Sequence, residues 1–184
     1  CANRDDSREM DRAIINADFV LWASPLKMGF PSELMKRAND KHLPLIHPYM
    51  EVDQGESHHL RRYPKSPRIG LLLEPEADTD ARDLQIVTDI HCRTALNFKT
   101  RLEFSLTIDA QPAEVAHRIT NQAAACLPLP KRLPATTGMT VTPPRSLTLF
   151  NGSPRGRKGN TAIFLREIAA GFGGPGEMHH LVRL

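Results

Sequence analysis

The feature that most constrains the fold is the stretch at residues 146–166, SLTLFNGSPRGRKGNTAIFLR. A short apolar run is followed by a turn rich in Gly, Ser, Pro and Arg, and then by apolar residues at helical spacing. Backbone N–H groups in such a turn, together with the positive end of the following helix, form a site for an anion. A strand, turn and helix of this kind usually open an α/β domain, yet here they lie near the end of the chain.

The first 124 residues predict a regular alternation of helices and strands. Short apolar runs are typical of strands buried on both faces of a parallel sheet; the predicted strands are residues 19–23, 68–73 and 102–108. Helical spacing and a cap at Ser32 predict the helices; these are residues 5–17, 32–41, 79–98 and 113–124, with Leu84, Val87, Ile90 and Thr94 on the inner face of the third. Residues 24–31 are predicted to be a loop and residues 43–67 an irregular excursion. The alternation predicts right-handed crossovers in an α/β fold.

A proline-rich segment at residues 125–145 divides the chain into two unlike pieces and reads as a linker. Beyond it, the predicted elements are a strand at 147–150, a turn at 151–159, a helix at 160–170 and a strand at 178–184. Residues 1–124 therefore read as the later part of an α/β domain. Residues 146–184 read as the opening strand, anion loop, helix and second strand of such a domain.

Charge and cysteine content exclude several classes of protein. A formal net charge of +3 is too mild to indicate a nucleic-acid-binding protein. The basic residues concentrate between Glu114 and Glu167, where the chain has no carboxylate, and this run coincides with the Gly-rich turn. Three distant cysteines predict no disulfide framework and favour the cytoplasm. No apolar run approaches the roughly 18 to 20 residues that cross a bilayer, so no membrane association is predicted.

The turn lacks two well-known nucleotide motifs. Gly159 is followed by Asn160 and not by Lys, so the Walker pattern of ATPases and GTPases is absent. The GxGxxG pattern of dinucleotide-binding folds is absent too. A phosphate-bearing ligand other than a nucleoside triphosphate or a dinucleotide is therefore the better hypothesis.

Two stretches of the chain resemble one known family. NGSPRGRKGNT, at 151–161, resembles the FMN phosphate loop of flavodoxin-like NAD(P)H-dependent FMN reductases, which include the iron–sulfur flavoproteins. Residues 5–41, DDSREMDRAIINADFVLWASPLKMGFPSELMKRANDK, are similar to the middle of the same family, where an acidic helix precedes a strand that ends in Ser-Pro. The resemblance implies a flavodoxin-like three-layer sandwich with a parallel sheet of about five strands, its pieces in permuted order.

The resemblance also implies a set of cofactor-binding residues and no catalytic residue. The implied phosphate contacts are Ser153, Pro154, Arg155, Asn160 and Thr161. The implied contacts to the flavin ring are Ser24, Pro25, Leu26, Lys27, Met28 and Gly29. Family members often carry an aromatic residue where Lys27 stands. Lys27 is either a cation that stabilises the reduced flavin or an ordinary exposed lysine.

Two explanations account for the order of the pieces. Either the chain is cut from a tandem protein and joins the end of one domain to the start of the next, or it is a single permuted domain. In both cases the pieces are expected to pack as one sheet, within the chain or by exchange between two chains, because half a sheet would expose its edge. Exchange between two chains would give a homodimer, and a homo-oligomer of this kind is the expected assembly.

The function implied by the resemblance is FMN-dependent oxidoreduction. NAD(P)H, as co-substrate, would reduce the flavin, which passes electrons to a small-molecule or protein acceptor. The alternative is a flavodoxin-like electron-transfer or interaction module, or an inactive piece of a tandem protein, that does not oxidise NAD(P)H.

Neither an iron–sulfur cluster nor a metal site is predicted. Cys1 stands where the iron–sulfur subgroup has its last cysteine, but partner cysteines are missing. Cys92 and Cys126 are expected to be packed or inert. The pairs His58-His59 and His179-His180 would point to opposite faces of a strand, and no carboxylate or cysteine follows them at ligand spacing.

Overall fold

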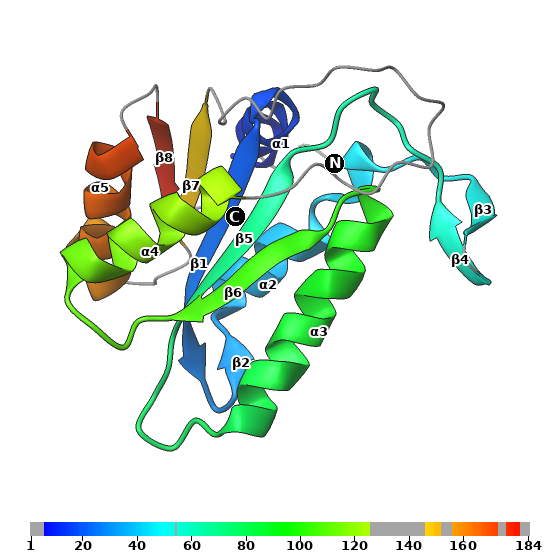
Figure 1. The fold of residues 1–184 in the computed structure, drawn as a ribbon. Coiled ribbons are helices and arrows are strands. Elements are labelled where there is room, and N and C mark those ends of the chain that lie inside the picture. Colours follow the sequence, from blue (N-terminus) through cyan, green and yellow to red (C-terminus); the bar gives the residue numbers. More distant parts are fainter. Residues whose placement is uncertain (1–5, 54, 126–145, 152–155, 173–175, 181–184) are drawn as a thin grey trace.

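A sheet of five parallel strands is the centre of the computed structural model, which describes residues 6–53, 55–125, 146–151, 156–172 and 176–180 (Figure 1). The strand order is β6-β5-β1-β7-β8. The strands are β1 (Phe19–Lys27), β5 (Arg68–Glu74), β6 (Leu102–Thr107), β7 (Leu147–Asn151) and β8 (Gly176–His180). All four pairings among them are parallel.

Both pieces of the chain contribute to this one sheet. β7, from the piece after the proline-rich segment, pairs along β1, and β8 pairs along β7. When the strands are counted from β7, their spatial order becomes 2-1-3-4-5, which is the flavodoxin-like order. The predicted flavodoxin-like sandwich with its pieces in permuted order is confirmed, and the sheet closes within one chain.

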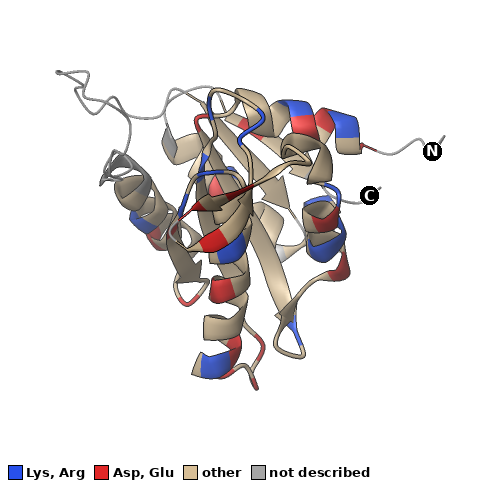
Figure 2. Cartoon of the chain, turned by 90° about the vertical axis from the view of Figure 1, so that its right-hand side faces the viewer, with Lys and Arg blue, Asp and Glu red and all other residues tan. Residues whose placement is uncertain are grey.

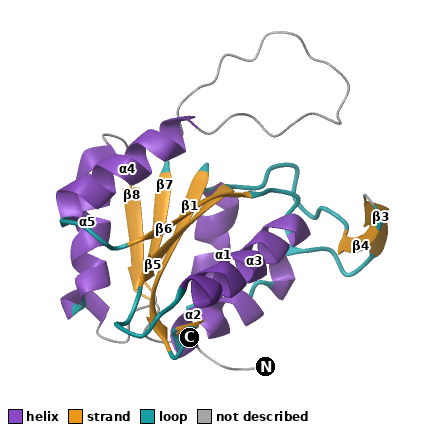
Figure 3. Ribbon diagram, turned by 60° about the horizontal axis from the view of Figure 1, so that its bottom comes forward, coloured by secondary structure: helices purple, strands orange, loops and turns teal. Residues whose placement is uncertain are grey.

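Helices cover both faces of the sheet (Figure 3). On one side lie α1 (Ser7–Asn16), α2 (Glu33–Asp40) and α3 (Ala81–Asn97), and on the other α4 (Pro112–Ala125) and α5 (Asn160–Phe172). We call these the α1–α3 face and the α4/α5 face. Side chains alternate along a strand. Val20 and Trp22 therefore pack in the apolar layer of the α1–α3 face, whereas Phe19 and Leu21 pack in that of the α4/α5 face.

Local sequence explains where two of the helices begin. The Ser32 hydroxyl accepts a hydrogen bond of 3.3 Å from the Met35 amide, as the predicted cap requires. α3 begins with a capping box, in which Asp80 accepts from the amides of Arg82 and Asp83 while the Asp83 carboxylate accepts from the Asp80 amide.

Three expectations for residues 1–124 are corrected: the loop at 24–31, the irregular excursion at 43–67 and the inner position of Ile90. Residues 24–31 are not a loop: β1 continues to Lys27, and β2 (Phe30–Pro31) folds back antiparallel on it. Pro25 is tolerated there because β7 ends at Asn151, opposite Ala23, so Pro25, which has no N–H to donate, lies beyond the part of β1 that pairs with β7.

The excursion at 43–67 is less irregular than expected. It contains the short 3-10 helix η1 (Leu43–Leu45) and a hairpin of β3 (Met50–Asp53) and β4 (Glu56–His59). On α3, the buried residues are Val87, His91 and Ala95. Ile90, which the sequence pattern predicts on the inner face of this helix, is 44% exposed.

Basic and acidic residues are interspersed on the helices of the described part of the chain (Figure 2). Several form pairs within or between elements, such as Lys36 with Asp40 along α2 and Arg118 with Asp109 at the start of α4. Since exposed pairs of this kind contribute little to stability, the fold depends on the two apolar layers.

Candidate functional site

The candidate site lies where the carboxyl ends of β7 and β1 meet. From β7 the chain crosses through α5 to β8 on one side, and from β1 it proceeds to β5 on the other, so the strand order reverses between them. Open α/β sheets bind ligands outside the carboxyl ends of their strands at such a reversal. The register places Asn151 of β7 beside Ala23, and Glu74 of β5 beside Pro25.

A side-chain hydrogen bond links the end of β7 to the residues that lead into α5. The buried Asn151 side chain donates this bond, of 2.9 Å, to the Gly156 carbonyl. Gly156 has φ of 52°, in the left-handed region that glycine adopts without strain. It opens the 3-10 helix η2 (Gly156–Lys158), which leads into α5. Three of the predicted phosphate contacts, Ser153, Pro154 and Arg155, lie outside the described residues.

The start of α5 carries the last two predicted phosphate contacts, Asn160 and Thr161. The backbone of Asn160 opens the helix, and its side chain lies outside the described part of the chain. Thr161 is fully buried, and its hydroxyl donates a hydrogen bond of 3.0 Å to Glu74 Oε2. A carboxylate therefore stands at the positive end of α5, where a phosphate would also be favoured.

The predicted ring contacts divide into an inner and an outer group. Ser24, Pro25 and Leu26 belong to β1 and are buried. The Ser24 hydroxyl donates to the Pro25 carbonyl at 2.9 Å and accepts from the Ser32 amide at 3.0 Å. The second bond joins β1 to Ser32, the residue that caps α2, so Ser24 holds the two ends of the hairpin together.

The outer group, Lys27, Met28 and Gly29, forms the tip of the β1–β2 hairpin. Met28 and Gly29 have φ of 51° and 76°, and the Met28 side chain is 89% exposed. Two positive φ values in succession are typical of the tight turn that joins twisted antiparallel strands. A Cβ on Gly29 would lie 2.7 Å from the Asp83 carboxylate, so the tip packs closely against the start of α3.

Glu76 fixes this tip. Its carboxylate pairs with the Lys27 ammonium and accepts a hydrogen bond of 3.1 Å from the Met28 amide. The hydrogen bond from Lys27, followed by that from Met28, lowers the pKa of Glu76. Lys27 is thus exposed but already paired with an anion, which weakens its effect on any further negative charge.

Sequence reasoning missed the two glutamates that frame the site. Glu74 and Glu76 directly follow the predicted strand at 68–73, at the same edge as the two predicted loops. Acids at the carboxyl end of a buried parallel strand are a usable signal, because such strand ends converge in space.

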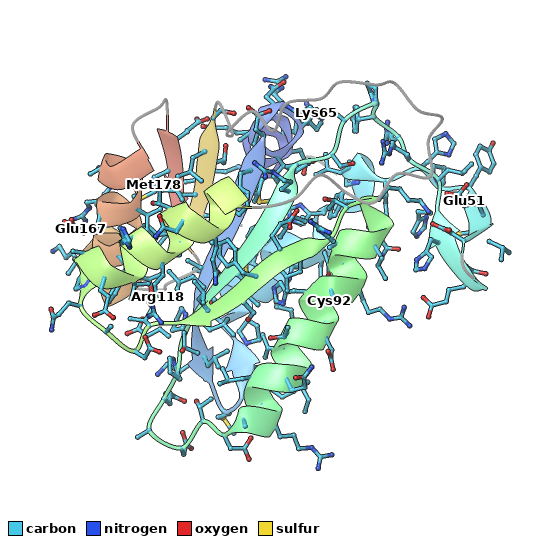
Figure 4. All side chains as sticks on the ribbon, viewed as in Figure 1. Glu51, Lys65, Cys92, Arg118, Glu167 and Met178 are labelled. Atoms are coloured by element: carbon cyan, nitrogen blue, oxygen red, sulfur yellow. The ribbon has the colours of Figure 1, made fainter. Side chains whose placement is uncertain are left out.

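The one cysteine in the described part of the chain is Cys92, which Figure 4 labels on α3. Burial, and then the nearby charge of Asp89, raise the pKa of its thiol. A thiol that stays protonated is a poor nucleophile, in agreement with the expectation that Cys92 is inert.

Within the described residues, no helix combines the length and the apolar character needed to cross a bilayer. Comparison with protein-family models and with curated proteins finds no match to this chain. The structure shows a flavodoxin-like fold with its pieces in permuted order. Near its strand reversal lie the β1–β2 hairpin, the start of α5, Glu74 and Glu76.

Proposed function

We propose that the chain binds FMN at the carboxyl ends of β7 and β1 and acts as an NAD(P)H-dependent oxidoreductase. One observation carries the proposal: the two stretches that resemble the reductase family are far apart in the sequence but meet in the sheet, where Asn151 is in register with Ala23. The strand reversal at that point is where flavodoxin-like sheets bind their ligand.

The chain's own groups have defined tasks in this proposal. The amides at the start of α5 and the Thr161 hydroxyl receive the phosphate. The exposed hairpin tip at Met28 and Gly29 borders the ring, with its backbone fixed by Glu76. The flavin, when bound, supplies the hydride chemistry.

Glu74 sets a condition on phosphate binding. The Thr161 hydroxyl donates to Glu74 in this structure, so it has to turn from the carboxylate to the phosphate when FMN binds. The two anions also repel each other across a short distance. The described residues therefore fit a phosphate at α5, with Glu74 weakening the fit.

An FMN titration tests the proposal directly. The expected result is a bound flavin spectrum at one FMN per chain, followed by bleaching when NADPH is added without oxygen. No bound flavin would reject the proposal. A flavin that neither NADPH nor NADH reduces would reject the reductase and favour the electron-transfer module.

Substitution of Glu74 and Thr161 tests the phosphate site. Because Glu74→Gln removes the repulsion and keeps the shape, FMN should bind roughly tenfold more tightly, whereas riboflavin, which has no phosphate, should be unaffected. Thr161→Val should weaken FMN binding by about fivefold. Asp109→Asn, the same charge change beside Arg118, is the matched control. Equal effects on FMN and riboflavin would contradict a phosphate at α5.

A further inference from the structure

A cluster of possible metal ligands lies at the edge strand β8, outside the crevice between β7 and β1. Glu9 of α1 and Glu177 and His179 of β8 each present one ligand atom, and these atoms all lie within 4.8 Å of one another. The cluster combines two carboxylates with an imidazole, from two elements that are distant in the sequence.

The strand geometry explains why β8 supplies two of the ligands. Glu177 and His179 are two residues apart and so share a face of β8. Met178, between them, points the other way and packs in the layer of the α4/α5 face, where Figure 4 labels it. Glu177 and His179 therefore face α1, which carries Glu9.

The imidazole is held in a fixed position. The rings of Trp22, Phe150 and His179 stack across three neighbouring strands, with centroids 4.7 Å and 5.2 Å apart. The register pairs Trp22 with Phe150 and Phe150 with His179, so the stack follows the sheet. Fixed ligand orientation lowers the cost of ordering a metal site.

The Nε2 atom of the imidazole lies close to the carboxylates. His179 Nε2 is buried and lies 3.2 Å from Glu177 Oε1, and it makes no hydrogen bond of acceptable geometry within the described part of the chain. A buried nitrogen without a hydrogen bond costs free energy unless another ligand satisfies it.

Space and charge beside the cluster also suit a cation. A hollow between α1 and the first residues of β7 and β8 is lined by both Glu9 and Glu177. Arg12 also lines it and offsets one of the two carboxylate charges. One negative charge remains when His179 is neutral, and the hollow leaves room for water to complete the coordination.

We propose that Glu9, Glu177 and His179 bind one divalent first-row transition metal ion, with Zn²⁺ as the reference. An imidazole with two carboxylates suits such ions, whereas Mg²⁺ prefers oxygen ligands alone. Three protein ligands leave at least one coordination position for water or another small ligand, as in open zinc sites. The site does not depend on flavin binding.

The chain contains a matched control for this site. On β4, Glu56 and His58 have the same spacing, and His58 Nε2 lies 3.1 Å from Glu56 Oε2. There, however, the carboxylate also pairs with Arg93 and not with a second acid. The Arg93 guanidinium thus already offsets the negative charge of Glu56.

Calorimetric titration of the metal-free, reduced protein with Zn²⁺ tests the proposal. We expect one Zn²⁺ to bind per chain, with Mg²⁺ at least 100-fold weaker. His179→Phe keeps the ring stack but removes the nitrogen, and Glu9→Gln keeps the shape but removes the charge. Each should weaken Zn²⁺ binding at least tenfold, while His58→Phe should leave it unchanged.

Thermal unfolding of each variant without metal separates a lost ligand from a lost fold. If Zn²⁺ fails to bind the wild-type chain, or if Glu9→Gln and His58→Phe have the same effect, the proposed site is wrong. Co²⁺ gives a second measurement: its visible absorption bands should appear in the wild type and disappear in His179→Phe.

Discussion

The two faces of the sheet are built from the same strands but differ in chemistry. The layer of the α4/α5 face is an apolar cluster, with Leu149 and Leu165 fully buried. The layer of the α1–α3 face is also apolar at its centre, but it encloses His42 and His91. The proposed metal ligands, Glu9, Glu177 and His179, all lie on the α1–α3 side.

The buried polar groups on that side are incompletely satisfied. Among the described residues, neither ring nitrogen of His42 finds a hydrogen-bond partner, although Asp11 Oδ1 lies 3.7 Å from its Nδ1. His42 instead packs between the rings of Trp22 and Phe98. Unsatisfied buried groups reduce stability. Both faces stabilise the fold through their apolar layers, but the α1–α3 face gives up some stability to hold the buried His42 and His91.

The largest expected effect comes from a cavity in the apolar face. Leu149→Ala should lower the free energy of unfolding by about 3 to 4 kcal/mol, because Leu149 is fully buried in the middle of β7. Urea denaturation at pH 7.5 and pH 5.5 measures it. The loss should be the same at both pH values, since no titratable group is removed. Ile163→Ala, at an exposed position of α5, should cost less than about 1 kcal/mol.

The second effect tests how tightly the apolar face is packed. A Cβ on Gly70 would lie 2.6 Å from the ring of Phe104 and 2.9 Å from that of Phe19. These two rings stack at 5.7 Å, so Gly70→Ala should cost about 1 to 3 kcal/mol. Thermal unfolding checks this. An unchanged melting temperature would mean that the layer of the α4/α5 face is packed loosely enough to admit an extra methyl group.

The third effect concerns pH and the α1–α3 face. Burial lowers the pKa of His91, and the hydrogen bond to the Val87 carbonyl opposes this only in part. Below pH 6.5 the unfolded chain therefore takes up a proton that the folded chain does not, so stability should fall as the pH falls. One such proton gives a slope of at most about 1.4 kcal/mol per pH unit.

Urea denaturation of wild type and His91→Gln between pH 7.5 and 5 measures that slope. The variant should be less stable at pH 7.5 but should lose less stability on acidification. Parallel curves for the two proteins would show that the α1–α3 face does not respond to the charge of His91.

The smallest effect concerns the start of α3. Asp80→Ala removes the side chain that accepts two backbone hydrogen bonds and should cost about 1 kcal/mol. Asp80→Asn keeps an accepting oxygen and is the control. A loss of more than about 2 kcal/mol would mean that the hairpin tip at Gly29, which packs on Asp83, depends on the same cap.

The sequence predicts the layers of this fold better than its site. Buried parallel strands are continuous apolar runs, so residues 68–73 and 147–150 are readily recognised. The Ser-Pro pair after residue 23 was a misleading stop signal, because proline is usually excluded from strands but tolerated beside an unpaired edge. The β3–β4 hairpin was not predicted because both strands are only four residues long and mostly exposed, and because Glu56–His59 has no apolar residue to alternate with its polar ones.

The polar clusters depend on tertiary pairing that a local pattern does not contain. Glu9 meets His179 only because α1 lies against β8, at the opposite end of the chain. Thr161 meets Glu74 only because α5 starts beside the end of β5. The spacing of Glu177 and His179 was visible, but it is identical to that of Glu56 and His58, so spacing alone does not separate the two pairs.

The permuted order has a consequence for how the sheet is assembled. β1 lies between β5 and β7, and β7 comes from the far side of the proline-rich segment. Because β5 precedes residues 147–151 in the chain, β1 can pair with β5 during synthesis while the edge that β7 will occupy is still open. Such an open edge invites pairing with a second chain, and closing it late requires a long-range contact, which slows folding. The same late event joins Ala23 to Asn151, so the last strand pairing to form at β1 is also the one that creates the candidate site.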